Sequence, residues 1–234
     1  VIGHIENYIM NWEDEGILLL KKKFRENANL VNIFTKNHGK TSGIVYGGNS
    51  RKIRNYLQVG NRLYLNHKAK NDNKIGYFQT ELIEPISPKY FDDKIRSCVL
   101  GCTTSILNCL LPDLQKNTDI YKSLNVFYKN LDSDSFIFYY LKWEIELIQQ
   151  LGYGINIGDK SKFNEDQDGL LSFKIDEFSY EIPKFLVGGE IHSNYSNQLV
   201  KKGLIFTKNL FLNKIFNVNN IQFPRQRIIL EKYF

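Results

Sequence analysis

Residues 38–54 read HGKTSGIVYGGNSRKIR, and this stretch decides between two folds. Its Gly39-Lys40-Thr41 tripeptide matches the end of a phosphate-binding P-loop, G-x-x-x-x-G-K-[ST], which lies between a strand and a helix. Phe34 occupies the position of the leading glycine, and the residues after Thr41 are β-branched and glycine-broken, as in a strand. We therefore expect strand geometry here and no nucleotide binding at the tripeptide.

Short strands separated by turn residues continue on both sides of this stretch. In one of them Leu63, Leu65, His67 and Ala69 alternate with polar residues, which gives one face for a core and one for solvent or ligand. Five strands in about seventy residues predict a small closed barrel, and the OB-fold is the common five-stranded barrel that binds oligonucleotides. We place the strands at residues 16–24, 28–36, 40–47, 62–70 and 75–84.

Helical periodicity replaces the strand pattern after Pro85 and Pro88. Ser135 is a candidate cap for the strongest helix, whose apolar stripe ends at Gly152. The segment at about 155–185 is an irregular, partly β-like excursion. The sequence thus predicts an α+β fold, in which an N-terminal five-stranded OB-fold barrel precedes a mainly α-helical C-terminal domain. We expect helices at residues 92–111, 118–131, 135–151 and 197–216, and a short one that Arg225 and Arg227 open.

Positive charge is concentrated in the predicted barrel. The whole chain has a formal charge of +6, yet residues 16–80 contain thirteen Lys or Arg against only Glu26 and Asp72. Such a basic region is typical of a surface that binds phosphates, although each lysine has solvation as an alternative explanation. Tyr46 or Tyr64 is a candidate for stacking a base, with core packing as the alternative. The candidate DNA-binding residues are Lys21, Lys22, Lys23, Arg25, Lys36, Lys40, Arg51, Lys52, Arg54, Arg62, Lys68 and Lys70.

Residues for catalysis or metal binding form no known motif in this sequence. The four histidines are scattered, and no nucleophile elbow, H-E-x-x-H or dinucleotide fingerprint is present. Cys98, Cys102 and Cys109 fall on one helical face, as small buried hydrophobes do. We therefore predict a binding protein with no catalytic residues, no metal site and no cofactor.

Apolar segments are too short for the ~20 residues that a membrane-spanning helix needs. The beginning of the chain, VIGHIENYIM, lacks the features of a signal peptide. We expect no membrane association and a cytoplasmic location.

Several segments together resemble the RecO family of recombination mediators. Trp12-Glu13-Asp14-Glu15-Gly16-Ile17-Leu18-Leu19 is similar to the start of the family's N-terminal barrel, as are the His38-Gly39-Lys40 and Gly47-Gly48-x-Ser50-Arg51 segments. Tyr140-Leu141-Lys142-Trp143-Glu144 resembles its central helix, and Pro224-Arg225-x-Arg227 its C-terminal part. Residues 155–170 lack the cysteines with which some members hold zinc, so no zinc is implied. The resemblance to family members begins at Met10. It implies an extra tail at residues 1–9, a DNA-binding barrel at 10–84 and a helical domain at 85–234.

The resemblance implies a role in bacterial recombinational repair. It implies a protein at the nucleoid that binds single- and double-stranded DNA, anneals complementary strands and helps load recombinase onto DNA coated by single-strand-binding protein. The implied partners are a RecR-like ring protein and the acidic, Phe-ended C-terminal tail of single-strand-binding protein. The alternative is a protein-interaction scaffold whose DNA contact is secondary.

Overall fold

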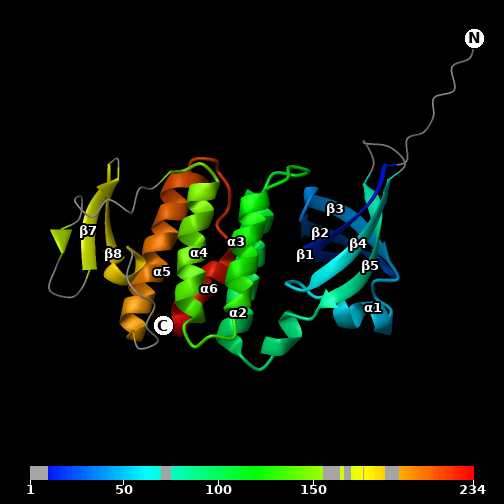
Figure 1. Cartoon of the computed structure of the whole chain (residues 1–234), viewed down its shortest axis with the longest axis horizontal. Helices are drawn as coiled ribbons and strands as arrows, with labels where there is room; N and C mark the ends of the chain where they lie inside the picture. The colour runs from blue at the N-terminus through cyan, green and yellow to red at the C-terminus, as the bar shows by residue number, and fades with distance from the viewer. Residues whose placement is uncertain (1–9, 70–74, 155–163, 166–169, 176, 188–194) are drawn as a thin grey trace, which may run out of the picture. The chain divides into compact units, whose positions relative to one another are not determined.

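The computed structural model describes residues 10–69, 75–154, 164–165, 170–175, 177–187 and 195–234 (Figure 1). The chain forms two compact units, Val1–Thr118 and Asp119–Phe234. A closed five-stranded barrel is followed along the chain by helices and a small sheet, so the α+β class predicted from the sequence is confirmed.

Five strands of the first unit close into a barrel in the order β1-β2-β3-β5-β4. Every neighbouring pair is antiparallel except β3 and β5, which run parallel. This is the five-stranded, closed arrangement of an OB-fold. The strands are β1 (Met10–Arg25), β2 (Ala28–Thr35), β3 (Gly39–Tyr46), β4 (Arg62–Ala69) and β5 (Gly76–Glu84).

Strand β1 is long because it pairs with two neighbours in succession. Its first half pairs with β4 and its second half with β2, and Gly16 belongs to both registers. A Cβ at Gly16 would lie 2.7 Å from Ile33 Cγ2 and 2.8 Å from Phe34 O, so the two strands can approach only at a glycine. The predicted start of this strand at residue 16 is therefore wrong, because β1 begins at Met10.

The barrel core contains the inward-facing side chains that the alternating pattern predicts. Leu63 and Leu65 are fully buried and His67 is 8% exposed, which confirms the predicted inner face of β4. The other core members come from the remaining four strands and from the residue that follows the helix after β3: Leu18, Val31, Ile33, Val45, Phe78 and Leu57.

A stack of three rings joins β1, β4 and the turn between β2 and β3. The Trp12 ring is stacked against His38, with centroids 4.0 Å apart, and against His67, with centroids 4.6 Å apart. His38 Nδ1 lies 3.0 Å from the carboxylate of the buried Asp14, which also accepts a hydrogen bond from the backbone N–H of Asn37. These contacts fix the turn between β2 and β3.

A short helix, α1 (Arg51–Tyr56), follows β3 in a segment where we predicted neither a strand nor a helix (Figure 1). Ser50 caps it by accepting a hydrogen bond from the backbone N–H of Ile53. Ile53 and Tyr56, three residues apart, pack together against the barrel core. The Tyr56 hydroxyl also donates to the Thr80 carbonyl at 2.6 Å. These packing and capping contacts stabilise the helix. The sequence did not predict it, because a glycine-rich turn comes directly before it.

Helix α2 (Lys94–Leu110) follows the 3₁₀ turn η1 (Ser87–Tyr90) in the same unit. Asp93 caps its N-terminus and accepts hydrogen bonds from the N–H groups of Ile95 and Arg96. Burial tends to raise the pKa of the Asp93 carboxyl, but these bonds and the Arg96 charge outweigh it and lower the pKa below its ordinary value.

The C-terminal end of α2 is held by the tripeptide that resembles a P-loop. Lys40 Nζ donates to the Asn108 carbonyl at 3.0 Å and lies 3.2 Å from Asp113 Oδ1. Gly39 has φ +71°, and a Cβ there would lie 2.1 Å from the Gln115 carbonyl oxygen. The tripeptide therefore forms the start of strand β3, as predicted, and its lysine binds the negative end of a helix.

The second unit is built from helices and a three-stranded sheet in the order β6-β7-β8. Phe127 and Tyr140 pack around Trp143, which is 2% exposed. Ser135 occupies the predicted N-cap position, although its side chain makes no capping hydrogen bond. The elements are α3 (Thr118–Lys129), α4 (Phe136–Gln150), β6 (Asn164–Glu165), β7 (Leu170–Ile175), β8 (Phe178–Pro183), η3 (Lys184–Leu186), α5 (Asn197–Phe211), the π-helical η4 (Leu212–Phe216), α6 (Arg225–Leu230) and η5 (Glu231–Tyr233).

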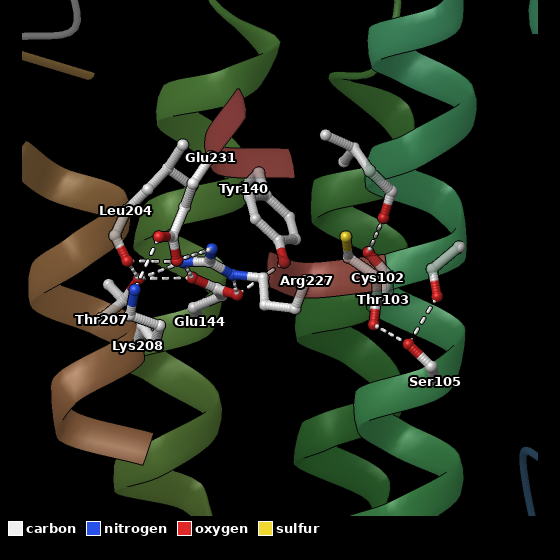
Figure 2. Close-up of polar contacts among 12 residues, drawn as sticks. Cys102, Thr103, Ser105, Tyr140, Glu144, Leu204, Thr207, Lys208, Arg227 and Glu231 are labelled. Carbon is white, nitrogen blue, oxygen red and sulfur yellow. Dashed lines mark hydrogen bonds and ion pairs between the residues drawn. The ribbon is translucent and has the colours of Figure 1, made fainter. Parts of the chain in front are cut away.

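A fully buried arginine joins three helices of this unit (Figure 2). Arg227 of α6 donates to both carboxylate oxygens of Glu144 on α4, at 2.6 and 3.0 Å. It also donates to the Leu204 carbonyl and the Thr207 hydroxyl of α5. The Tyr140 hydroxyl donates to Glu144 at 2.5 Å, so the buried carboxylate has further donors.

Hydroxyl groups inside α2 bond back to their own helix. Thr103 donates to the Val99 carbonyl and Ser105 to the Gly101 carbonyl (Figure 2). Cys102 is buried, as predicted for a small apolar residue, whereas Cys98 and Cys109 are only half-buried. Burial raises the pKa of the Cys109 thiol, partly offset by the Lys40 charge.

Two predicted segments fall outside the described residues: the extra tail at 1–9, and residues 155–163, which begin the predicted excursion. The described part of that excursion holds the β6-β7-β8 sheet, more regular than we expected. No helix of the described part of the chain is long and apolar enough to cross a membrane.

Candidate nucleic-acid interface

Four of the twelve predicted DNA-binding cations are engaged by the fold itself. Lys40 holds the end of α2 and its side chain is only 11% exposed. Arg62 lies 3.4 Å from Glu84 with 14% of its side chain exposed, and Lys36 pairs with Glu15 at 3.1 Å. The side chains of Lys40 and Arg62 are therefore poorly placed to follow a phosphate backbone.

Lys21 is the fourth engaged cation. Its Nζ donates to the carbonyl of Leu57, the C-cap of α1, at 2.8 Å. Burial lowers the pKa of Lys21, and the nearby Arg54 charge lowers it further. Lys21 thus positions α1 against β1.

Seven of the remaining cations form no ion pair with any residue that the structure describes. All are exposed except Lys68, which is half-buried. Lys70, the last of the twelve, lies outside the described residues. The seven free cations are Lys22, Lys23, Arg25, Arg51, Lys52, Arg54 and Lys68.

Two groups of these cations, far apart in the sequence, are brought together by a hydrogen-bonded loop. The turn after β1 and the loop before α1 are joined by the Gly47 N–H, which donates to the Asn27 carbonyl at 2.8 Å. The Asn49 side chain donates to the Glu26 carbonyl at 2.8 Å and accepts from Asn29 Nδ2 at 3.1 Å. A Cβ at Gly48 would lie 2.3 Å from Asn29 Nδ2, so a side chain at this position would displace the Asn29 amide from its bond with Asn49.

The result is one basic surface, which we call the β1–α1 basic edge. It combines Lys22, Lys23 and Arg25 at the end of β1 with the three exposed cations of α1, namely Arg51, Lys52 and Arg54. A phosphate backbone can approach this edge because the linking loop is made of small residues.

Exposed tyrosines extend this surface over the outside of the barrel. Tyr46, at the end of β3, is 57% exposed, and Tyr77, at the start of β5, is 38% exposed. Their rings meet edge to face, with centroids 6.2 Å apart. Core packing is therefore not the role of Tyr46, the alternative that the sequence left open.

The other candidate, Tyr64, lies in acidic surroundings. It faces Glu15 on β1 and Glu81 on β5 across the strands. A hydrogen bond to the Glu13 carboxylate, together with burial and the nearby negative charges, raises the pKa of the Tyr64 hydroxyl. These carboxylates would repel a phosphate backbone, so Tyr64 is a poor candidate for base stacking.

Sequence reasoning missed two aromatic residues at this surface. Tyr77 meets Tyr46 only through the parallel pairing of β3 and β5, which no local pattern reveals. Phe24 is 46% exposed, and the Arg25 guanidinium lies over its ring, 5.2 Å from the centroid. Phe24 could have been predicted from the sequence, because an aromatic residue among the cations of a strand that ends in Lys-Lys-Phe-Arg is expected to be exposed.

Acidic, histidine and cysteine side chains do not gather into a metal site in the described part of the chain. No group of three or more of them is placed to hold an ion there. The prediction that the protein needs no metal or cofactor stays a prediction.

These features define a class of protein in which an OB-fold barrel with a basic edge is joined to a helical second unit. Residues 10–86 match the family described as Recombination protein O N terminal. Wolbachia pipientis has a DNA repair protein RecO that is 28% identical over 240 residues, covering 94% of this chain and 99% of the relative.

Two further relatives carry the same name. The DNA repair protein RecO of Mesorhizobium japonicum is 32% identical over 161 residues, which cover 68% of this chain and 63% of the relative. That of Roseobacter denitrificans is 31% identical over 147 residues, or 62% of this chain and 61% of the relative. The chain belongs to the RecO family.

Proposed function

We propose that this protein is a recombination mediator in bacterial DNA repair. In this proposal it binds single- and double-stranded DNA, anneals complementary strands and helps load recombinase onto DNA coated by single-strand-binding protein. Its work is binding and positioning, with no covalent step, and it takes place at the nucleoid in the bacterial cytoplasm. Family membership supports the role in repair, and the barrel at residues 10–84 is the proposed DNA-binding domain.

The β1–α1 basic edge is the observation that carries the proposal. Arg51, Lys52 and Arg54 are exposed, lie within one short helix and form no ion pair among the described residues. Cations on one rigid element can follow phosphates without reading bases, so binding should be tolerant of sequence and should weaken steeply with salt.

The test replaces the three α1 cations by alanine and measures affinity for a single strand against salt. If about five phosphates are neutralised, the slope of log affinity against log salt is about -3.5 for the natural protein, at roughly -0.7 per contact. The variant Arg51→Ala/Lys52→Ala/Arg54→Ala should bind more weakly at low salt, with a slope flatter by about two units. Alanine is a good helix former and exposed cations contribute little to stability, so the fold should be retained.

Lys36→Ala is the matched control, because this barrel cation already pairs with Glu15. It should leave the slope almost unchanged. Equal slopes for the natural protein and the triple variant would show that α1 does not contact DNA, and would leave the family role without its proposed surface.

Protein partners are the second part of the proposal: a RecR-like ring and the C-terminal tail of single-strand-binding protein. One face of α6 supports a site for an acidic tail that ends in an aromatic residue. Ile228 and Ile229 are 45% and 37% exposed, and the exposed cations beside them are Arg225 of α6 and Lys232 of the following turn η5. A scaffold whose DNA contact is secondary is the alternative that this face favours.

The full-length protein tests this second part with a fluorescent tail peptide. Ile229→Asp should weaken binding of the peptide and leave DNA affinity unchanged. Unaltered peptide binding would exclude this face as the docking site, whereas loss of both activities would point to misfolding.

A further inference from the structure

Tyr46 and Tyr77 form an exposed aromatic pair that the barrel core does not need. The parallel register places Ile44 opposite Tyr77, so that both tyrosines emerge on the outer face of the barrel. Their edge-to-face contact occupies the flat side of only one ring, which leaves aromatic surface open to solvent. Aromatic pairs across strands also stabilise sheets, so exposure alone does not assign a role to this pair.

The surroundings of the pair favour a nucleic-acid base over other ligands. The registers define a row across all five strands on the outer face, with half-buried Leu30 and Ile44 inside it and cations at both ends. Tyr46 belongs to the adjacent row, which Arg25 begins on β1. Such a row can accommodate a ligand that is flat and apolar in the middle and carries negative charge on either side. In order, the first row is Lys22, Leu30, Ile44, Tyr77 and Lys68.

The pair also lies where OB-folds bind oligonucleotides. Tyr46 is opposite Ala28, directly after the turn that joins β1 and β2, and Tyr77 is near the start of β5, after the β4–β5 connection. Ligands of OB-folds bind on the face of strands 2 and 3 between these two connections.

We propose that Tyr46 and Tyr77 stack bases of single-stranded DNA, while Lys22, Arg25 and Lys68 hold its phosphates. This rests on the proposed DNA-binding function and goes further, because it assigns the pair a choice between nucleic acids. Bases of a duplex are already stacked on one another and offer no free face to the tyrosines. The pair therefore favours single strands over duplex, whereas the β1–α1 basic edge binds either one.

The experiment compares two double variants of the full-length protein. Tyr46→Thr/Tyr77→Thr keeps residues that suit strands but removes both rings, and Tyr46→Phe/Tyr77→Phe keeps the rings. Base stacking on aromatic rings contributes so much binding free energy that the threonine variant should lose about 10-fold or more in affinity for single strands. Its duplex affinity should stay within about twofold and its salt slope unchanged, since phosphate contacts remain. The phenylalanine variant should bind like the natural protein.

Tyr64→Thr is the matched control, because this tyrosine is also exposed but lies among carboxylates. It should change neither affinity. A threonine double variant that binds single strands as well as the natural protein does, or that loses single-strand and duplex affinity equally, would overturn the inference. If the natural protein binds no DNA at all, the proposed function fails as well, so the two failures are distinguishable.

Photocrosslinking gives a second measurement that needs no variant. An oligothymidylate that carries iodouracil crosslinks to aromatic side chains stacked on the base. The crosslinked peptide from the natural protein should contain Tyr46 or Tyr77. Crosslinks confined to other residues would contradict the assignment.

Discussion

Replacement of Arg227 by methionine should destabilise the second unit strongly. The side chains of Arg227 and Glu144 are both completely buried, so their interaction is not screened by solvent. Methionine fills much of the arginine volume but removes both bonds to the carboxylate and the bond to the Leu204 carbonyl. What remains is a buried carboxylate that keeps only hydroxyl donors, from Tyr140 and Thr207.

The magnitude follows from the cost of leaving such a charge without its partner. Loss of one member of a buried ion pair costs about 3 to 5 kcal/mol, a large part of the ~5 to 15 kcal/mol that stabilises a typical domain. With a urea slope of about 2 kcal/mol/M, the unfolding midpoint should fall by roughly 1.5 to 2.5 M.

Urea unfolding followed by far-UV circular dichroism measures this change. Arg225→Ala is the control, because it removes an exposed cation from the same helix and should alter the free energy of unfolding by less than about 0.5 kcal/mol. The double variant Arg227→Met/Glu144→Leu should recover at least half of the loss, because it also removes the buried charge. An Arg227→Met protein within about 1 kcal/mol of the natural one would refute this reasoning.

Two further predictions concern the first unit. Lys40→Ala should lower the free energy of unfolding, because the C-terminal end of α2 loses the cation that binds the Asn108 carbonyl. Saturable ATP binding by the natural protein that disappears in this variant would contradict the assignment of the tripeptide to a strand. Asp93→Asn should destabilise the protein at neutral pH and matter progressively less in acid. The folded-state pKa of Asp93 is lowered, so its stabilisation is complete above the ordinary value of 3.8 and is lost as the pH falls through the lowered folded value. Equal destabilisation by Asp93→Asn at every pH would contradict this cause.

Local pattern predicted most of the barrel and of the helices. Alternation in β4 gave the buried face correctly, and the glycine-broken sequence after Lys40 identified a strand in place of a P-loop. The beginning of β1 was missed because Glu13 and Asp14 are polar, yet their backbone groups pair with β4. A strand of this kind is defined by its neighbour and not by its own side chains.

The binding surface was less predictable than the fold. A count of cations could not distinguish Lys40, which holds a helix end, from Lys22, which is exposed. The link between the β1–β2 turn and the loop before α1 depends on hydrogen bonds of Asn49 to residues about twenty positions away. Contacts of this range need the folded chain, and so does the meeting of Tyr46 with Tyr77.

Each compact unit contains one of the two tryptophans, and this gives the protein two built-in optical probes. Trp12 lies between two imidazole rings and is only partly buried, so its fluorescence emission should lie toward the red. Trp143 is enclosed by Phe127 and other apolar side chains, so its emission should lie further to the blue. With Trp12→Phe and Trp143→Phe variants, each unit becomes visible alone in the intact chain. The emission spectrum of each variant then reports whether DNA or a partner protein partly unfolds one unit while the other stays folded.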